Sequence, residues 1–241
     1  MKTVFFASAA AAALIAAPAF AQDTAGSVGV SYQYNDTDIA SVKGIDTDTF
    51  AIDGVVATPI FGDWTVTAAA QVANTESDFA KSETNLSGSV ALTKLVGTYR
   101  LGGFYAANEA AGNTETTFGG VAQKYFNQAT VTGVASYTTV GQTDAWTVSA
   151  DAAYYVTPAL RLNAGLGYNN VDNKLFDAEY VSATIGAEYQ VSNSPYSVFG
   201  SYTYTDSDDL RLEDNGIKIG VRYNFGGNLQ ARDRAGAGLG L

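Results

Sequence analysis

Residues 216–225, Gly-Ile-Lys-Ile-Gly-Val-Arg-Tyr-Asn-Phe, alternate strictly between apolar and polar side chains. The apolar face ends in Tyr223 and Phe225, and the polar face carries Lys218 and Arg222. A period of two predicts a β-strand whose two faces meet different environments. In a soluble sandwich the polar face would meet water. In a membrane barrel the apolar face would meet lipid and the polar face would line a lumen.

The N-terminus, residues 1–21, has the pattern of a cleaved signal peptide. Lys2 supplies a basic start, residues 4–17 are apolar, and Ala19-Phe20-Ala21 is a small-x-small cleavage site. The apolar stretch is too short and too rich in alanine to span a membrane well as a helix. We therefore expect an exported protein whose mature chain begins at Gln22 and whose contact with a membrane is made by strands.

Similar alternating segments recur from residue 25 to residue 225, which predicts an all-β domain over 22–225. We count about twelve strands of roughly nine to eleven residues, the length that a tilted strand needs to cross a bilayer and about twice an ordinary strand. The weakest strand lies near Val121, where alternation fades. If it and its partner did not form, ten strands would remain, because strands must be lost in pairs to keep both termini on one side.

The connections between these strands form two classes. The short class contains Pro59, Pro158 and Pro195. The long class holds most of the acidic residues and comprises 35–48, 75–85, 107–116, 170–180 and 205–214. Outer-membrane barrels have short periplasmic turns and longer external loops. We therefore predict periplasmic termini and an acidic outer mouth. The acidic mouth favours cations and the basic lower lumen favours anions, so the sequence leaves the ion selectivity open.

Aromatic side chains on the predicted lipid face cluster at two depths, with aliphatic segments such as 66–70 and 162–166 between them. Trp and Tyr prefer the two headgroup levels of a membrane because their rings are apolar and carry one polar tip. A general preference of Tyr and Trp for strands would not sort them by depth. The pattern favours a transmembrane antiparallel up-and-down β-barrel over a soluble sandwich. The two groups are Tyr32, Tyr34, Phe50, Trp146, Tyr168, Tyr202 and Tyr204, and Trp64, Tyr99, Tyr154, Tyr189 and Tyr223.

Composition narrows the chemistry. The 241 residues contain no His and no Cys and carry a formal charge of −11. The lack of His removes His-dependent catalysis and most zinc chemistry, and the acidic balance argues against nucleic acid. An aspartate pair of Asp53 and Asp151 would lie on distant strands. We predict no enzyme activity, no cofactor and no metal site, since the acidic segment 205–214 lacks the glycine that an EF-hand turn needs.

The closing segment also carries a resemblance. Lys218-Ile-Gly220-Val-Arg-Tyr223-Asn-Phe225 resembles the C-terminal strand signal of bacterial outer-membrane proteins, and this resemblance implies insertion by the outer-membrane assembly machinery of a Gram-negative cell. The family's terminal Phe normally ends the chain, whereas here residues 226–241 follow. That tail is similar to the tails of small alphaproteobacterial porin-like barrels. Its Gly and Ala content predicts a disordered periplasmic tail; a plug folded into the lumen is the alternative.

The predicted lumen sets the function that we expect. Twelve strands give a backbone radius of roughly 12 Å and leave about 6 Å inside short side chains. Most inward positions are small and polar, which favours a narrow porin-like channel for small hydrophilic solutes. Alternatively, a pore-less barrel would serve as an adhesin or a structural protein of the outer membrane. The expected partners are outer-membrane lipid and lipopolysaccharide.

Seven charged residues fall on inward positions of the predicted strands. They would either form a constriction that tunes ion preference or pair with one another, for example Arg161 with Asp151 or Glu188, to hold the inside of the barrel. Both roles are compatible. The seven are Asp53, Arg100, Asp151, Arg161, Glu188, Lys218 and Arg222.

Overall fold

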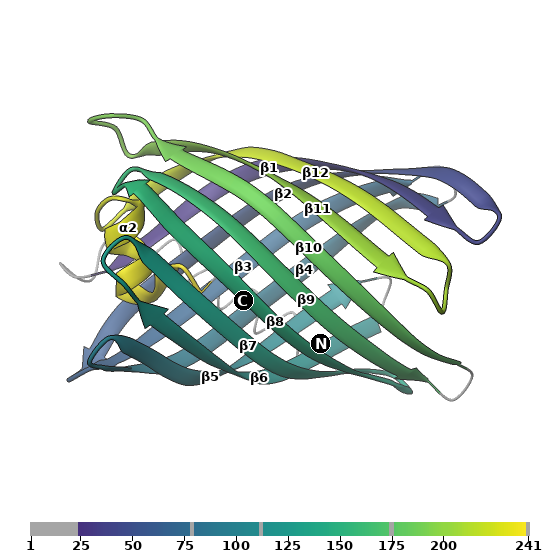
Figure 1. The fold of residues 1–241 in the computed structure, drawn as a ribbon, viewed down its shortest axis with the longest axis horizontal. Helices are drawn as coiled ribbons and strands as arrows, with labels where there is room; N and C mark the ends of the chain where they lie inside the picture. The colour runs from purple at the N-terminus through teal and green to yellow at the C-terminus, as the bar shows by residue number, and fades with distance from the viewer. Residues whose placement is uncertain (1–23, 78–79, 111–112, 174–175, 240–241) are drawn as a thin grey trace.

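The computed structural model describes residues 24–77, 80–110, 113–173 and 176–239. These residues form one closed barrel of twelve antiparallel strands in which each strand pairs with its neighbours in sequence (Figure 1). The expected signal peptide and cleavage site lie outside the described residues. No helix within the described part of the chain is long and apolar enough to cross a membrane.

The strands follow one another around the barrel with short connections. Their bounds are β1 Ala25–Ile39, β2 Val42–Phe61, β3 Trp64–Ser77, β4 Ala80–Val96, β5 Tyr99–Ala110, β6 Asn113–Tyr125, β7 Ala129–Val140, β8 Thr143–Thr157, β9 Leu160–Asn173, β10 Phe176–Gln190, β11 Tyr196–Ser207 and β12 Leu212–Phe225. We call the end of the barrel with Ala25 and Phe225 the turn end, and the opposite end the hairpin end.

The last strand closes the barrel. β12 pairs with β1 from Phe225 opposite Gly26 to Leu212 opposite Ile39, and pairs with β11 on its other edge. Its side chains alternate as the sequence predicts. Ile217 and Ile219 are 54% and 57% exposed on the outer face, whereas Lys218 and Arg222 line the interior cavity.

The strand with the weakest alternation also forms, so the barrel has twelve strands and not ten. β6 pairs with β5 from Lys124 opposite Tyr99 to Asn113 opposite Ala110, and with β7 on its other edge. Its pattern is faint because Gly119 faces inward without a side chain. The ring of Phe104 from β5 fills that space, at 2.6 Å from where a Cβ on Gly119 would lie.

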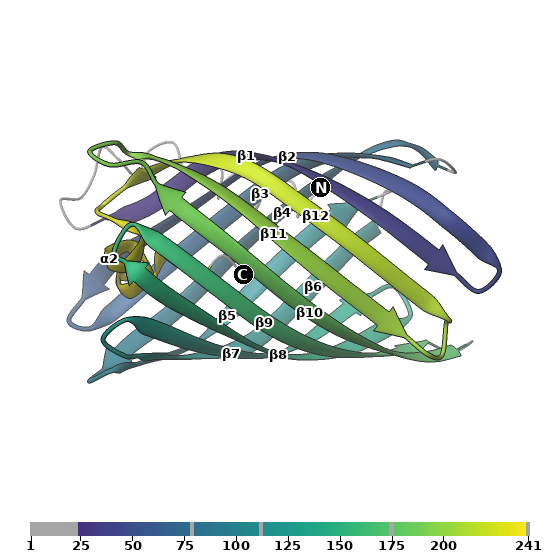
Figure 2. The ribbon, with the colours of Figure 1, turned by 45° about the horizontal axis from the view of Figure 1, so that its top comes forward.

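The predicted long loops are wrong in form. β1 and β2 remain paired almost to the tip of their hairpin, so most of 35–48 is strand, and much of 205–214 is strand as well. The strands are 12 to 20 residues long, and they project beyond the apolar part of the barrel as hairpins (Figure 2). Water meets both faces of these extensions, so no alternation of hydrophobicity marks them in the sequence.

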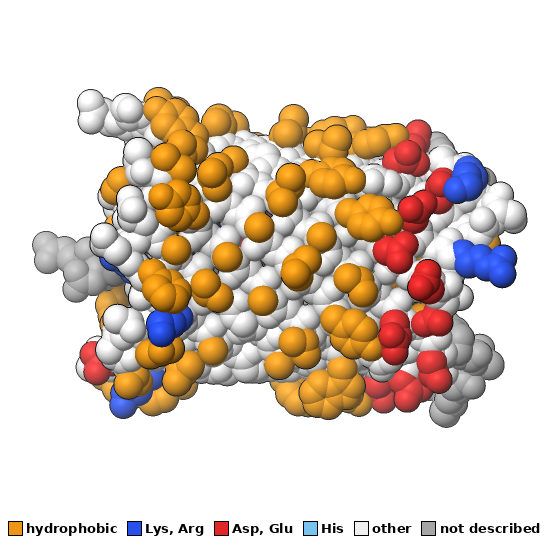
Figure 3. Space-filling view, viewed as in Figure 1, with side chains coloured by type: hydrophobic (Ala, Val, Ile, Leu, Met, Phe, Trp, Pro, Cys, Tyr) orange, Lys and Arg blue, Asp and Glu red, His pale blue; other side chains and the backbone are white. Residues whose placement is uncertain are grey.

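The outside of the barrel is apolar between its two ends (Figure 3). Aliphatic side chains such as Leu166 and Ile185 are 67% and 61% exposed there. Trp146 and Tyr154, from the two predicted aromatic groups, are 59% and 50% exposed. An exterior of this kind would be unfavourable in water, and it matches the lipid-facing band of a transmembrane barrel.

The tail does not have the predicted disorder. After Phe225 the chain reverses through Gly226 and Gly227, whose φ angles are +79° and +117°, and enters the lumen at the turn end (Figures 1 and 2). Its helical turns are α2, Leu229–Arg232, and η2, Asp233–Ala237. The alternative of a segment folded into the lumen is therefore the one that the structure shows.

Apolar contacts explain why so short and glycine-rich a tail is ordered. Leu229 is 5% exposed and packs with Ala153 and Tyr155 of β8, and Ala237 packs with Ala25 and Ala57. These small apolar positions face inward at the turn end, where sequence alternation places lumen residues. Burying them offsets the conformational entropy lost on ordering the tail.

Gly220 is predicted to be required at the seam. A Cβ at this position would clash with the ring of Phe199 and lie 2.5 Å from the carbonyl oxygen of Val30. Gly220→Val should therefore lower the free energy of unfolding by about 1–3 kcal/mol, measured by urea unfolding in lipid vesicles. Gly200→Ala is the matched control, since its nearest atom is 3.6 Å away. Equal stability of the two variants would contradict this role.

Candidate functional site: the lumen and its turn end

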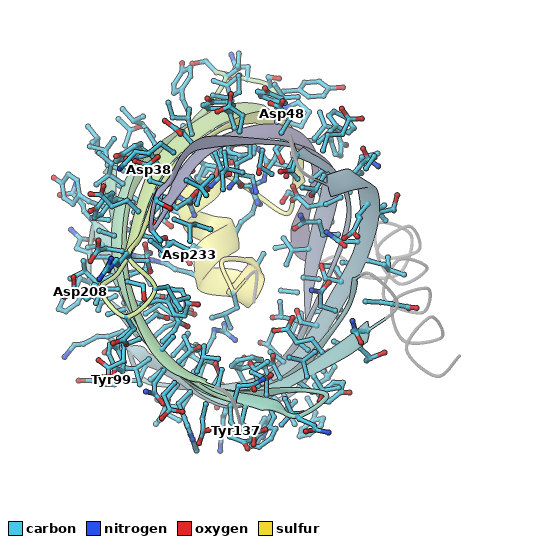
Figure 4. All side chains as sticks on the ribbon, turned by 90° about the vertical axis from the view of Figure 1, so that its right-hand side faces the viewer. Asp38, Asp48, Tyr99, Tyr137, Asp208 and Asp233 are labelled. Atoms are coloured by element: carbon cyan, nitrogen blue, oxygen red, sulfur yellow. The ribbon has the colours of Figure 1, made fainter. Side chains whose placement is uncertain are left out.

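The interior contains a cavity of about 750 Å³. One wall, formed by β3, β4 and β5, carries small side chains, whereas the wall formed by β9, β12 and α2 carries cations. The small-side-chain wall includes Ala69, Ala70, Ser87, Gly88, Ser89 and Ala107. Short side chains leave the centre of the barrel free, and the open interior between the strands and the tail is visible from the hairpin end (Figure 4).

Five of the seven inward charged residues line this cavity, namely Asp53, Arg161, Glu188, Lys218 and Arg222. Arg100 and Asp151 are not among its lining residues. Arg100 is only 3% exposed and lies against the tail. Asp151 faces Gly165 of β9, with its Oδ2 3.4 Å from where a Cβ on that glycine would lie.

Glu188 is the centre of the charged wall. It is 3% exposed and accepts a hydrogen bond of 2.7 Å from Ser197. Its Oε2 lies 3.2 Å from Arg161 Nη2 and 3.4 Å from Arg222 Nη1. Of the pairings that the sequence suggests for Arg161, the structure shows the one with Glu188. A carboxylate shared by two guanidiniums holds β9, β10 and β12 together on their inner face.

Arg222 has two further contacts. Its guanidinium carbon lies 4.1 Å from the centre of the Phe199 ring, a cation–π geometry, and its Nε lies 3.7 Å from Asp53 Oδ2. The second distance is too long for a hydrogen bond. Arg222 is thus fixed above a ring and between two carboxylates, one on β10 and one on β2.

Arg100 anchors the tail. Its Nη2 donates to the carbonyl oxygen of Arg234 at 2.9 Å, and its other nitrogens donate to Thr93 and Tyr125 at 3.0 and 2.9 Å. The alternation of the predicted strand places Arg100 inward as a cation. Its buried hydrogen bonds give it a structural role. A guanidinium suits this role because its planar fork donates in several directions at once.

Further hydrogen bonds fix the tail to β3, to β7 and to the turn between β6 and β7. Thr67 donates to the Gly236 carbonyl oxygen at 3.2 Å, and Thr130 donates to the Asp233 carboxylate at 2.5 Å. Arg234 donates to the carbonyl oxygens of Phe126 and Asn127 at 2.6 and 2.7 Å. Arg232 is bonded to Asn224 of β12, on another side of the barrel. The tail therefore crosses the turn end and occupies part of it. Figure 4 shows Asp233 inside the ring of strands and Tyr99 and Tyr137 outside it.

Sequence reasoning missed the tail's own site residues, Arg232 and Asp233. Arg232 is 7% exposed, lines the cavity, and makes a short hydrogen bond to the side-chain oxygen of Asn224. The signal that was available is the run Arg232-Asp233-Arg234 in an otherwise uncharged Gly and Ala segment.

Only part of the expected acidic mouth forms. Glu115 lines the cavity, and Asp214 lies on the same face of β12 as Lys218 and accepts hydrogen bonds from Asn35 and Thr37. Other acidic residues of the hairpin end point outward. Several accept hydrogen bonds from tyrosines of the outer face, such as Asp46 from Tyr34 at 2.6 Å and Glu213 from Tyr204 at 3.0 Å. Figure 3 shows acidic side chains around the outside of this end. Because the strands extend farther than predicted, alternation continues and directs these carboxylates outward, away from the lumen.

At the tip of the first hairpin, the Lys43 ammonium donates to the Asp38 carboxylate at 2.5 Å. This hydrogen bond is the main reason why the pKa of Asp38 is lowered.

Over the described ranges, no group of three or more acidic, His or Cys side chains is placed to hold a metal ion.

Comparison with known proteins places the fold. No protein-family profile and no curated protein matches the sequence. Among solved structures, the chain is similar to an outer membrane channel from Pseudomonas putida F1, with a TM-score of 0.72, 11% identity, and coverage of 85% of this chain and 97% of that one. It is also similar to the translocator domain of autotransporter NalP from Neisseria meningitidis, with a TM-score of 0.58, 15% identity, and coverage of 92% and 99%.

A third similar structure is the KdgM porin in complex with disordered oligogalacturonate, with a TM-score of 0.57 and 10% identity over 82% of this chain and 99% of that one. At these identities the likeness concerns the fold. The chain therefore has the closed transmembrane barrel fold that outer-membrane channels and translocators share.

The anchoring role of Arg100 predicts that Arg100→Ala loosens the tail. The chain has no Cys, so Ala237→Cys, at a position 5% exposed, provides one thiol to label in the folded barrel. Loss of a charge-assisted hydrogen bond should raise the maleimide labelling rate of this thiol about tenfold.

Lys124→Ala is the matched control for Arg100→Ala. It removes a cation bonded to Tyr99 on the outer face of the same region and should leave the labelling rate unchanged. If Arg100→Ala does not raise the labelling rate, the other contacts hold the tail in place without Arg100.

Proposed function

We propose that this protein is an outer-membrane channel for passive diffusion of small hydrophilic solutes. The observation that carries the proposal is the combination of an apolar exterior with a cavity of about 750 Å³ lined largely by small polar and charged side chains. A barrel built only as an anchor gains nothing from keeping its interior free of large side chains. Barrels of eight strands fill their interior with side chains, and those of sixteen or more leave a channel; twelve lies between.

Other observations support this proposal. Two of the similar structures carry the names channel and porin, and the chain lacks the His on which many hydrolases depend. We propose the turn end as periplasmic, with both termini there, because external hairpins project farther than periplasmic turns. Outer-membrane lipid, lipopolysaccharide and the assembly machinery are the proposed partners, and the tail's likeness to alphaproteobacterial porin-like barrels stays a prediction.

A second candidate is a pore-less barrel that acts as an adhesin or a structural protein of the outer membrane. The tail favours it, because α2 and η2 occupy the turn end and are bonded to β3, β5 and β7. The two candidates differ in whether solute passes beside the tail. They agree on the barrel, its orientation and its partners.

Planar-bilayer conductance separates the two candidates. The refolded chain 22–241 should show small single-channel steps, and a chain ending at Gly227, which keeps Phe225 and the seam, should show steps several times larger. The physical reason is that removing the tail widens the narrow end. Stability of both chains against urea serves as the folding control.

Each result has one meaning. Steps from both chains support the channel, and steps from the shortened chain alone support the pore-less candidate. Conductance equal to that of empty lipid for both folded chains would contradict the channel and also the role of the tail as its constriction.

A further inference from the structure

Three guanidiniums converge on the cavity where the tail meets the strands. Arg161 comes from β9, Arg222 from β12 and Arg232 from α2, and all three line the same cavity together with Lys218. Their nearest common acid is Glu188, which lies within 3.4 Å of Arg161 and Arg222. This group of Arg161, Arg222 and Arg232 is called the arginine cluster below.

The three guanidiniums of the arginine cluster have two carboxylates within ion-pair distance, Glu188 and Asp53. A third acid of the cavity, Asp233, is bonded to Thr130. Within the described ranges, no carboxylate lies within ion-pair distance of Arg232 or Lys218. Arg232 instead donates to the neutral amide oxygen of Asn224. Asn224 in turn donates to Ser197 at 3.0 Å, and Ser197 donates to Glu188. Glu188, the acid that this series of hydrogen bonds connects to Arg232, is thus already bonded to two other guanidiniums.

Burial makes this arrangement informative. Arg232 is 7% exposed, and its Nε has no hydrogen-bond partner among the residues described. The Nε atoms of Arg161 and Arg222 are likewise buried without a hydrogen-bond partner there. A buried cation without a counter-charge is costly, and a guanidinium is shaped to bind two oxygens of a carboxylate or phosphate at once.

We propose that the arginine cluster binds the oxyanion group of small carboxylate- or phosphate-bearing solutes. This inference rests on the proposed channel function and names its solute class. Glu188 holds Arg161 and Arg222 in place, and the tail supplies the third guanidinium, so the site is complete only when α2 is docked. The carboxylates bonded to Tyr34 and Tyr204 face the outside. Of the inward acids, Glu115 lies on β6, whereas the arginine cluster lies on β9, β12 and α2.

The test measures binding first, in a form that does not need conduction. The folded chain 22–241 in zwitterionic detergent is titrated at low ionic strength with inorganic phosphate, with succinate and with uncharged glycerol, followed by calorimetry. Phosphate or succinate should bind and glycerol should not. Which of the two binds more tightly identifies the oxyanion. Absence of binding by both anions would overturn the proposal.

Variants assign the binding to the arginine cluster. Arg232→Gln should weaken anion binding about tenfold, the loss expected for one charge-assisted hydrogen bond. Lys43→Gln, at a hairpin tip where Lys43 is bonded to Asp38, is the matched control and should bind as the unaltered chain does. Binding that Arg232→Gln leaves unchanged would overturn the proposal.

The shortened chain ending at Gly227 gives the same information if Arg232→Gln does not fold, because it lacks Arg232 and keeps the strands. It should bind at least tenfold more weakly than the full chain. The reversal potential in a KCl gradient should also favour chloride for the full chain and shift toward potassium for the shortened one. Conduction without anion binding or chloride preference would overturn the arginine cluster as a solute site and leave the channel standing. Anion binding without conduction would overturn the channel and leave the arginine cluster standing as an anion site.

Discussion

The pairing of β12 with β1 is the constraint on which the rest of the molecule depends. A strand in hydrocarbon has no water to satisfy its N–H and C=O groups, so an open edge would leave a row of them unpaired. The register from Phe225 opposite Gly26 to Leu212 opposite Ile39 removes that edge. Closure also fixes the inside and the outside of every strand, because neighbouring strands share one alternation.

The inside that closure creates is asymmetric. Small residues on β3, β4 and β5 leave space, and the opposite wall gathers Glu188, Arg161 and Arg222. The tail joins this wall with Arg232 and is tied to the other side by Arg100. The charged wall of the cavity is therefore formed by the strands and the tail together.

Much of the barrel was predictable from the sequence because one physical rule, alternation between lipid and lumen, applies to every membrane-facing residue. The closing strand, the twelve-strand fold and the inward face of Lys218 and Arg222 follow from it. The rule fails where its cause is missing. Beyond the bilayer both faces meet water, so the paired extensions near Ile39 and Leu212 are indistinguishable from loops. β6 is hard to recognise in the sequence for a different reason. Gly119 faces inward but has no side chain, and the ring of Phe104 from β5 fills that space.

The tail was beyond prediction on different grounds. Its order comes from two separate apolar contacts, Ala25 and Ala57 on β1 and β2, and Ala153 and Tyr155 on β8. Only the closed barrel places both at one interior. Apart from the charged run Arg232-Asp233-Arg234, no property of 226–241 by itself indicates that such a surface exists. The Gly226 and Gly227 reversal is readable in retrospect, because both residues adopt positive φ angles that other residues rarely adopt.

The position of that reversal has a consequence for the order of events during biogenesis. The tail follows the last strand and docks on surfaces contributed by β1, β2, β3, β5, β7 and β8, which share a common interior only after the first and last strands have met. Docking therefore comes after closure. A closed barrel with an undocked tail would lack Arg232 in its lumen. The segment after the last strand therefore sets the charge of the turn end by contacts within one chain.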